Sequence, residues 1–312
     1  MNNRLPVVLL VLAALGAVAP LVGLYPVFLM KALCFALFAC AFNLLIGYTG
    51  LLSFGHAAFF GSAGYIAGHL VKVVGLTPEL GIIAGAAVSA LLGWGVGSLA
   101  IRRQGIYFAM ITLALSQMLY FVYLQVPQTG AEDGLQGVPR GSLFGFIGLG
   151  EDLTLYYVVL AIFLAGYALL QRIVSSPFGQ VLKAIRENEA RVLSLGYDVD
   201  RHKLLAFVLS AALAGVAGAT KTIVLGFETL TDSSWEMSGE VVLMTLVGGL
   251  GTLLGPVVGA FSIVTLQHYL ADKVGAWVQV IIGSAFVICV VALRKGIVGT
   301  LAARFMKKDA EI

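Results

Sequence analysis

The sequence has 312 residues, of which 60% are hydrophobic and 11% charged, and its formal net charge is +3. Soluble domains average about 45–50% apolar and about 25% charged residues, so this composition excludes a soluble globular protein and a disordered chain. Three cysteines are too few for a disulfide scaffold, and all lie in apolar runs: Cys34, Cys40 and Cys289.

Apolar runs long enough to cross a bilayer recur along the whole chain. A helix needs about 20 such residues to cross roughly 30 Å of hydrocarbon, and the alternation typical of a membrane β-barrel is missing. The N-terminal run, with Ala17-Val18-Ala19, also resembles a cleaved signal peptide, but its apolar stretch continues to Leu24. We therefore predict an all-α polytopic membrane protein with spans near 5–24, 27–46, 56–73, 81–100, 105–124, 154–174, 204–222, 253–270 and 276–293.

Basic residues indicate the orientation of these spans. With a cytoplasmic N-terminus, the cytoplasmic segments hold fourteen of the 19 Lys and Arg residues. They are Arg4, Arg102, Arg103, Arg172, Lys183, Arg186, Arg191, Arg201, Lys203, Arg294, Lys295, Arg304, Lys307 and Lys308. The positive-inside rule therefore places both termini in the cytoplasm. Nine crossings would put the tail outside, so we predict about ten, the extra one being a short or broken helix near 238–250, beside the Gly- and Pro-rich stretch 248–256.

The whole chain, 1–312, is predicted to be a single transmembrane domain with a periplasmic loop at 125–153, a cytoplasmic loop at 175–203 and a cytoplasmic tail at 295–312. In the cytoplasmic loop an apolar stripe recurs at helical spacing: Phe178, Val181, Leu182 and Ile185. A second short helix is expected to begin at Asn188 or Glu189 and to end at Gly196. Such helices can lie on a membrane surface, but the five basic and four acidic residues from Lys183 to Lys203 favour a protein partner.

Glycine-rich stretches interrupt the apolar runs at 47–55 and at 248–255. Paired interruptions indicate a substrate path in transporters, although no convincing internal repeat accompanies them. A small-residue seam that permits close helix packing follows the first break: Gly61, Gly64 and Gly68. Three polar residues at this break are candidates for the substrate path, with helix capping as the alternative: Thr49, Ser53 and His56.

Motifs for catalysis and nucleotide binding are missing from the sequence. It has no Gly-Lys-Ser/Thr, HExxH, CxxC or GxSxG, so we predict neither an enzyme nor a metal site. The four histidines have no ligand spacing: His56, His69, His202 and His268. The acidic residues lie in loops or at span ends, which disfavours an ion-coupled secondary carrier. Lys31 and Lys221 are expected to snorkel from outer span ends.

Five segments together resemble one family of transporters. They are GYTGLLSFGHAAFFG (47–61), TGAEDGLQGVPR (129–140), the stretch 184–219 that begins AIRENEARVLSLGYD, VGGLGTLLGPVVGA (247–260) and RKGIVG (294–299). In this order they are similar to the membrane permease of ABC importers for branched-chain amino acids, the LivM type of the LivH/LivM pair. The family often has Leu where this chain has Phe54, and a stretch rich in Gly-Gly where this chain has Thr-Gly-Ala-Glu-Asp at 129–133. These differences leave urea, short amides and aromatic acids open as alternative cargo.

The resemblance implies a subunit of an importer in a bacterial inner membrane, surrounded by the lipid bilayer and without a nucleic-acid partner. A second homologous permease and two cytoplasmic ATPases would complete it, and a periplasmic binding protein would deliver Leu, Ile or Val. This chain would bind no cofactor, because ATP and Mg belong to the ATPases. The coupling contact with the ATPases would be made by Arg186, Glu187, Asn188, Glu189, Ala190, Leu195 and Gly196. A stand-alone channel or receptor is a further alternative, but it leaves this loop without a role.

Overall fold

The structure is a computed structural model that describes residues 5–23, 25–277, 280–281, 283–284, 287 and 296–300. Its α-helices in chain order are α1 (Leu5–Val18), α2 (Pro26–Tyr48), α3 (His56–His69), α4 (Pro78–Ala100), α5 (Ile106–Gln125), α6 (Asp152–Ser175), α7 (Pro177–Glu187), α8 (Glu189–Ser194), α9 (Val199–Leu225), α10 (Trp235–Gly248) and α11 (Gly255–Val274). Four two-residue strands lie in the connections: β1 (Leu135–Gln136), β2 (Ser142–Leu143), β3 (Ile147–Gly148) and β4 (Phe227–Glu228). β1 pairs antiparallel with β4, and β2 with β3.

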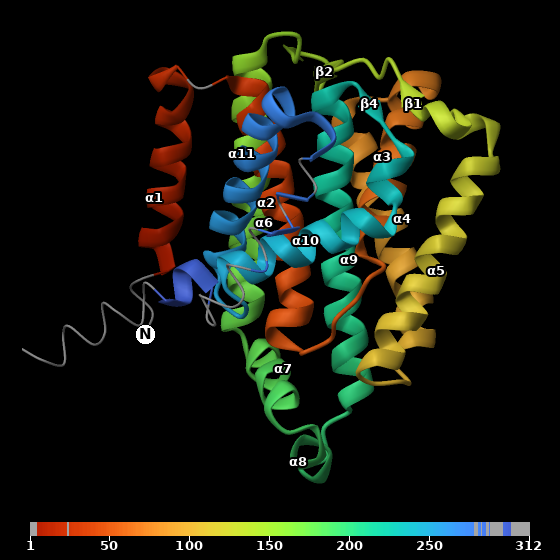
Figure 1. Cartoon of the computed structure of the whole chain (residues 1–312), viewed down its shortest axis with the longest axis vertical. Coiled ribbons are helices and arrows are strands. Elements are labelled where there is room, and N and C mark those ends of the chain that lie inside the picture. Colours follow the sequence, from red (N-terminus) through yellow and green to blue (C-terminus); the bar gives the residue numbers. More distant parts are fainter. Residues whose placement is uncertain are drawn as a thin grey trace, which may run out of the picture.

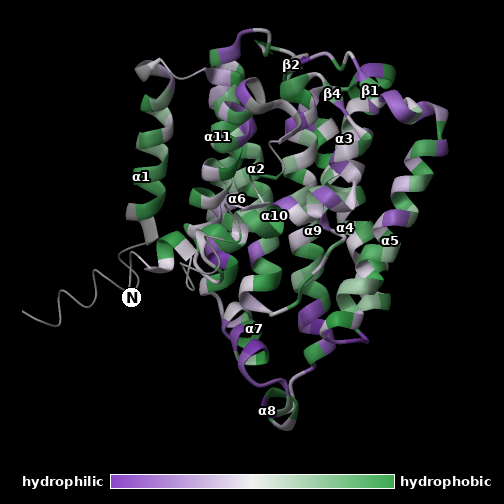
Figure 2. Ribbon diagram, in the orientation of Figure 1, coloured by the Kyte–Doolittle hydropathy of each residue, from purple (hydrophilic) through white to green (hydrophobic). Residues whose placement is uncertain are grey.

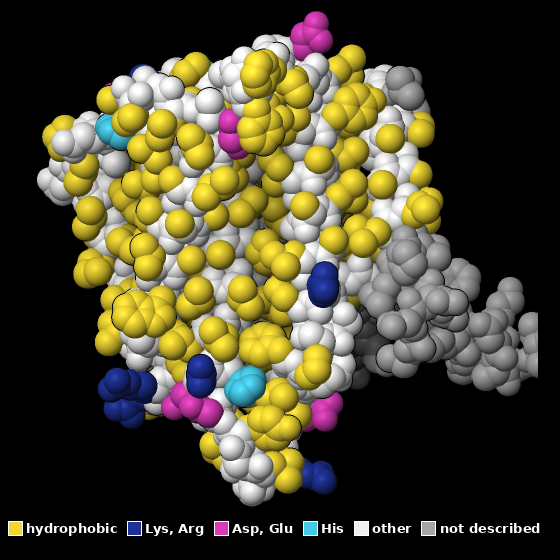
Figure 3. Space-filling view, turned by 180° about the vertical axis from the view of Figure 1, so that it is seen from behind, with side chains coloured by type: hydrophobic (Ala, Val, Ile, Leu, Met, Phe, Trp, Pro, Cys, Tyr) yellow, Lys and Arg dark blue, Asp and Glu magenta, His cyan; other side chains and the backbone are white. Residues whose placement is uncertain are grey.

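The long helices run between two polar ends. Figure 1 shows α7 and α8 at one end and the strands at the other, and Figure 2 shows hydrophilic residues gathered at these ends. In the space-filling view of Figure 3, hydrophobic side chains cover the middle of the visible face, and most charged side chains lie towards the two ends. Within the described residues, six helices are long and apolar enough to cross a membrane: α2, α3 with its π-helical extension to Val74, α4, α5, α6 and α9. The chain is therefore mostly helical and polytopic, as its sequence predicts.

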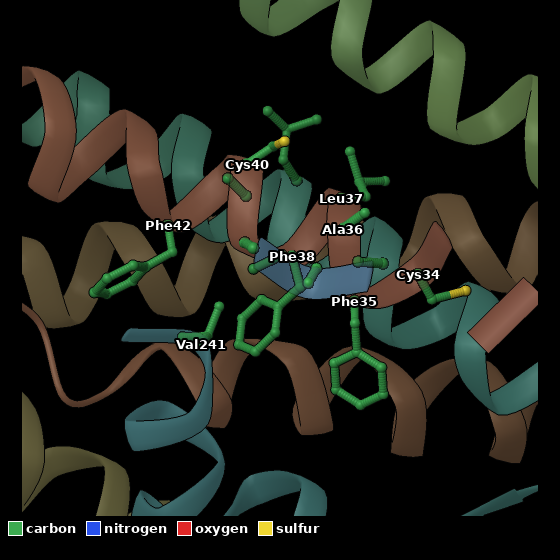
Figure 4. Close-up of a cluster of buried hydrophobic side chains, with 14 of the residues drawn as sticks. Cys34, Phe35, Ala36, Leu37, Phe38, Cys40, Phe42 and Val241 are labelled. Atoms are coloured by element: carbon green, nitrogen blue, oxygen red, sulfur yellow. The ribbon is translucent and has the colours of Figure 1, made fainter. Parts of the chain in front are cut away.

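Helix α2 is the centre of the bundle. It is apolar on every side, and such a helix is stable only when it is buried all round. Its neighbours are α6, α9, α10 and α11, and Phe35, Phe38 and Phe42 are among its buried side chains in Figure 4. Phe38 packs on Phe60 of α3 with 4.5 Å between ring centroids. This core fixes the positions of the two glycine-rich breaks, which begin at the ends of α2 and α10.

The predicted short helix near 238–250 is confirmed as α10, which runs obliquely across the bundle and ends at Gly248 (Figure 1). The loop 125–153 holds two short 3₁₀ turns, η3 (Pro127–Thr129) and η4 (Ala131–Asp133), and the strands β1, β2 and β3. Most of the predicted span 276–293 and of the tail 295–312 lies outside the described residues. The number of crossings and the side on which each terminus lies thus stay predictions.

Candidate functional site

Helices α7 and α8 project from one end of the bundle (Figure 1). Ser176 caps α7, because its hydroxyl accepts a hydrogen bond from Gly179 N at 3.4 Å. On the predicted apolar stripe, Leu182 and Ile185 are buried. A small cluster then joins α7, α8 and the start of α9: Ile185, Val192 and Val199. The predicted amphipathic helix is confirmed, and it is fixed to α9.

Two of the predicted coupling residues hold α8 in place. Asn188 Oδ1 accepts a hydrogen bond from Arg191 N at 3.1 Å, which confirms that the second helix begins here. Glu189 forms a 2.7 Å ion pair with Lys203, whose side chain is only 3% exposed. The same carboxylate accepts a hydrogen bond from Gln104 at 2.8 Å. Glu189 therefore ties α8 to α9 and to the α4–α5 turn.

Apolar side chains face water at the tip of this projection. Leu193 is 55%, Leu195 68% and Tyr197 46% exposed. Gly196 between them has a φ of +84°, the left-handed conformation that ends the turn. Two further predicted coupling residues are exposed nearby: Glu187 and Ala190. Sequence reasoning selected Leu195 but missed Leu193 and Tyr197, although their apolar character at the end of a short polar helix was a usable signal.

Arg186 contacts the interior of the bundle. Its Nη1 donates a hydrogen bond to the backbone oxygen of Gly47, in the last turn of α2. Lys183 adds a second link, because its Nζ lies 5.7 Å from the ring centroid of Tyr48. The coupling projection is thus attached directly to the first glycine-rich break.

The two glycine-rich breaks meet in space at Gly47 and Gly251, which are 204 residues apart in the chain (251 minus 47). Asn43 Nδ2 donates to Thr252 O at 2.8 Å, and Asn43 Oδ1 accepts from Gly251 N at 3.1 Å. A Cβ at Gly47 would lie 2.8 Å from Gly251 N, so only glycine permits this approach. The two glycine-rich interruptions predicted from the sequence therefore form one junction, in which the Asn43 side chain makes two hydrogen bonds.

The three candidate residues of the substrate path lie buried at the first break. Thr49 Oγ1 donates to Leu45 O at 2.5 Å, and Ser53 Oγ accepts from Gly55 N at 3.2 Å. Both hydroxyls thus satisfy backbone groups at the end of α2 and the start of α3. Their exposed fractions are 4% and 0%, and that of His56 is also 0%.

The His56 imidazole is enclosed in the core. Its Nε2 lies 2.8 Å from Ser210 Oγ, and that hydroxyl donates its proton to Ala41 O. Ser210 must therefore accept from His56, so the proton is on Nε2 and Nδ1 is bare. Among the described residues Nδ1 has no hydrogen-bond partner. Three rings meet the imidazole edge to face: Phe42, Phe59 and Phe207.

A buried ionic cluster lies at the strand end, where α9 leads into β4. The ammonium of Lys221 pairs with Asp232, and it lies 3.2 Å from Glu228 Oε2, which also accepts from Thr222 at 2.5 Å. Lys221 is 3% exposed, so the prediction that it snorkels to the surface is wrong. Burial raises the pKa of the Glu228 carboxyl to about 8. At pH 7 the Glu228 carboxyl is therefore mostly protonated.

The predicted glycine seam packs against this cluster. A Cβ at Gly61 would clash with Ser233 Oγ, and one at Gly64 would lie 2.5 Å from Thr222 Oγ1 and from the Glu228 carboxyl carbon. The seam thus permits close packing, as predicted, but its neighbour is a polar segment following α9. Sequence reasoning missed the cluster, although Lys221 is followed by acids seven and eleven residues later.

A cavity of about 520 Å³ opens beside the cluster, between α5, the 3₁₀ turn η5 (Leu230–Ser233) and α10. Apolar, hydroxyl and acidic side chains line it, among them Leu124, Met237, Thr231, Glu132, Glu236 and Glu240. Glu240 accepts a hydrogen bond from Gln267 at 2.9 Å. The lining is acidic and holds no basic residue, so it suits a small ligand that combines an ammonium group with an apolar part.

Comparison with known proteins places this architecture in a family. The chain is 29% identical to the high-affinity branched-chain amino acid transport system permease protein LivM of Escherichia coli, over 74% of this chain and 60% of that protein. It is 28% identical to a probable branched-chain amino acid transport permease protein LivH of Methanocaldococcus jannaschii, over 73% of this chain and 75% of that one. An autoinducer 2 import system permease protein LsrC of Klebsiella pneumoniae is 34% identical over 47% of this chain and 42% of that protein.

The aligned region covers only about 60% of the LivM proteins of Escherichia coli and Salmonella typhimurium. No solved structure gives a significant match to the chain. Residues 25–291, from the start of α2 to beyond α11, match the family described as branched-chain amino acid transport system / permease component. This chain, with its glycine-rich breaks and its helical projection, therefore belongs to the family of permease components of branched-chain amino acid transport systems.

Proposed function

We propose that this chain is the membrane-spanning permease subunit of an ATP-driven importer and that it translocates the branched-chain amino acids Leu, Ile and Val. Two ATPases bind the α7–α8 projection from the cytoplasm and hold ATP and Mg. A second, homologous permease completes the pathway, and a periplasmic binding protein delivers the cargo at the strand end. Family membership favours this importer over an ion-coupled secondary carrier.

The observation that carries the proposal is the apolar tip of the projection. Leu193, Leu195 and Tyr197 expose their side chains at the polar end of the molecule, beyond the apolar belt. Charges of both signs surround them, which suits a protein groove better than an anionic lipid surface. The tip stands on helices fixed by the Glu189–Lys203 ion pair, so force applied to it is passed to the bundle.

The membrane arrangement follows from the same assignment. Arg102 and Arg103 lie exposed in the α4–α5 turn, at the same end as α7–α8, which agrees with a cytoplasmic location for this end. The apolar belt lies in the lipid of a bacterial inner membrane. Ten crossings, with 276–293 as the last, place both termini in the cytoplasm.

The cargo route passes from the acidic cavity at the strand end towards the junction of the two glycine-rich breaks. The carboxylates of the cavity attract the ammonium of an amino acid, and its apolar residues accept the side chain. Thr49, Ser53 and His56 line the route when the junction opens. Their Ala variants should slow uptake or change its selectivity. Unchanged rate and selectivity in all three would remove them from the route.

Purification of the tagged protein in mild detergent tests the assembly. Wild type should retain two ATPases and a related permease, and Leu195→Arg should lose the ATPases while inserting normally. The matched control is Phe146→Arg, which changes a 93% exposed ring between β2 and β3 at the opposite end and should keep them. Recovery of wild type alone, under conditions where a known ABC importer stays intact, would contradict the proposal.

Uptake in proteoliposomes tests the cargo. With the binding protein present, labelled leucine should enter only when ATP is supplied, and excess isoleucine or valine should compete with it. If urea, short amides or aromatic acids competed and isoleucine and valine did not, the chain would still be an importer subunit but its assigned cargo would change.

A further inference from the structure

Arg186 is unusual among the residues of the coupling projection, because its guanidinium points into the bundle. Its Nη1 donates to Gly47 O, one of the last carbonyls of α2, which have no partner within their own helix. A positive charge at this position also stabilises the negative end of the α2 dipole. Among the described residues Arg186 forms no ion pair, so the hydrogen bond to Gly47 O is the polar contact that holds its guanidinium.

The same side chain touches both glycine-rich breaks. Its Cγ would lie 3.3 Å from a Cβ at Gly50, and its Nη1 would lie 3.1 Å from a Cβ at Gly251. Both glycines have positive φ, +77° and +74°, so each is a turning point of the chain. The side chain of Arg186, a residue that is otherwise exposed, thus lies between Gly50, two residues after the end of α2, and the residues that join α10 to α11.

Asn43 holds the other side of Gly251. Its two hydrogen bonds fix Gly251 N and Thr252 O to α2, one helical turn before Gly47. The 249–254 segment is therefore held between an amide on α2 and a guanidinium on α7. Movement of α7 relative to α2 must change the contact at Gly47, the contact at Gly251, or both.

We propose that Arg186 is the positioning residue that transmits the movement of the α7–α8 projection to both glycine-rich breaks, so that they change conformation together. This inference rests on the proposed function, because the movement is supplied by the ATPases. It assigns to Arg186 a role inside the permease that differs from a docking contact with the ATPase.

The test uses the complete importer, with both permeases, both ATPases and the binding protein, in proteoliposomes. Arg186→Gln removes the positive charge and shortens the side chain that donates the hydrogen bond, whereas Arg186→Lys keeps the charge. Arg103→Gln is the matched control, because it removes an exposed arginine from the α4–α5 turn, at the same end of the molecule but outside the projection, whose side chain makes no described hydrogen bond. The readout is leucine transported per ATP hydrolysed, together with copurification of the ATPases.

Transport per ATP in Arg186→Gln should fall about tenfold, which corresponds to about 1.4 kcal/mol. The ATPases should still copurify and hydrolyse ATP, Arg186→Lys should recover part of the ratio, and Arg103→Gln should resemble wild type. Adding Asn43→Ala to Arg186→Gln should cost less than the sum of the single losses, because both act on Gly251.

Hydrogen exchange provides a second measurement on the conservative variant. In wild type, trapping the ATPases with ADP and vanadate should change exchange in 47–55 and in 249–254 together, and in Arg186→Lys the two changes should be smaller. A normal transport ratio in Arg186→Gln, loss of the ATPases from that variant, or equal exchange responses in wild type and Arg186→Lys would overturn the inference. Absence of ATPases from the wild-type complex would instead overturn the proposed function, and the inference with it.

Discussion

Two isosteric changes in the buried cluster should have very different costs. Asp232→Asn removes one of the two carboxyl partners of Lys221 and leaves its ammonium, only 3% exposed, dependent on Glu228, a carboxyl that burial keeps mostly protonated at pH 7. Breaking a buried pair in this way costs about 3–5 kcal/mol. Glu228→Gln replaces a carboxyl that is already protonated at pH 7, because its pKa is about 8. The amide keeps an acceptor oxygen for Lys221 and Thr222, so the cost should stay below about 1 kcal/mol.

The assay is thermal unfolding of the purified protein in detergent at pH 7. At about 2 °C per kcal/mol, Asp232→Asn should lower the Tm by roughly 6–10 °C and Glu228→Gln by no more than about 2 °C. The exposed pair Arg140–Asp152, with side chains 29% and 42% exposed, provides the control, and Asp152→Asn should cost less than about 1 kcal/mol. Equal losses from Asp232→Asn and Glu228→Gln would refute the assignment of a protonated carboxyl to Glu228.

Three further predictions concern the buried ionic cluster, the glycine seam and the junction of the two glycine-rich breaks. The pKa of Glu228 in the folded protein is about 8, above its ordinary 4.5, so the stability that its bound proton contributes is lost as the pH rises between these values. The Tm of wild type should therefore fall from about pH 6 to pH 9 more than the Tm of Glu228→Gln. Parallel curves of Tm against pH would contradict this. Gly61→Val should prevent stable folding, measured as monodisperse protein after solubilisation, whereas Gly95→Ala, with no atom within 4 Å of its added Cβ, should be neutral or stabilising by up to about 1 kcal/mol. Asn43→Ala should cost about 1–3 kcal/mol by unpairing Gly251 N and Thr252 O, and a Tm equal to wild type would show that the junction does not depend on this side chain.

The helices could be predicted from sequence because their signals are local. Runs of apolar residues determine α2 or α9 within a few positions, and the spacing of Leu182 and Ile185 identifies the buried face of α7. Gly196 and Asn188 likewise have local roles at helix ends, which turn chemistry alone indicates.

The contacts of the site could not be predicted, because they join residues far apart in the chain. Asn43 and Gly251 are 208 residues apart, and Arg186 and Gly47 are 139 apart. The resemblance to the family placed Arg186 among the residues that face a partner, but its long side chain reaches back to the C-terminal end of α2. Lys221 was assigned to the surface because the acids that neutralise it lie in a different element, beyond the end of its own helix.

The brevity of α10 affects how the protein can be made. Fourteen residues at 1.5 Å each extend only about 21 Å, less than the roughly 30 Å of hydrocarbon that a helix must cross. Its side chains Val241, Met244 and Thr245 are fully buried against other helices, so its stability depends on them and not on lipid. The segment therefore cannot leave the translocation machinery for the bilayer on its own. We expect its insertion to depend on α2, which is made before it, and on α11, which is made after it, so that this part of the chain is inserted late.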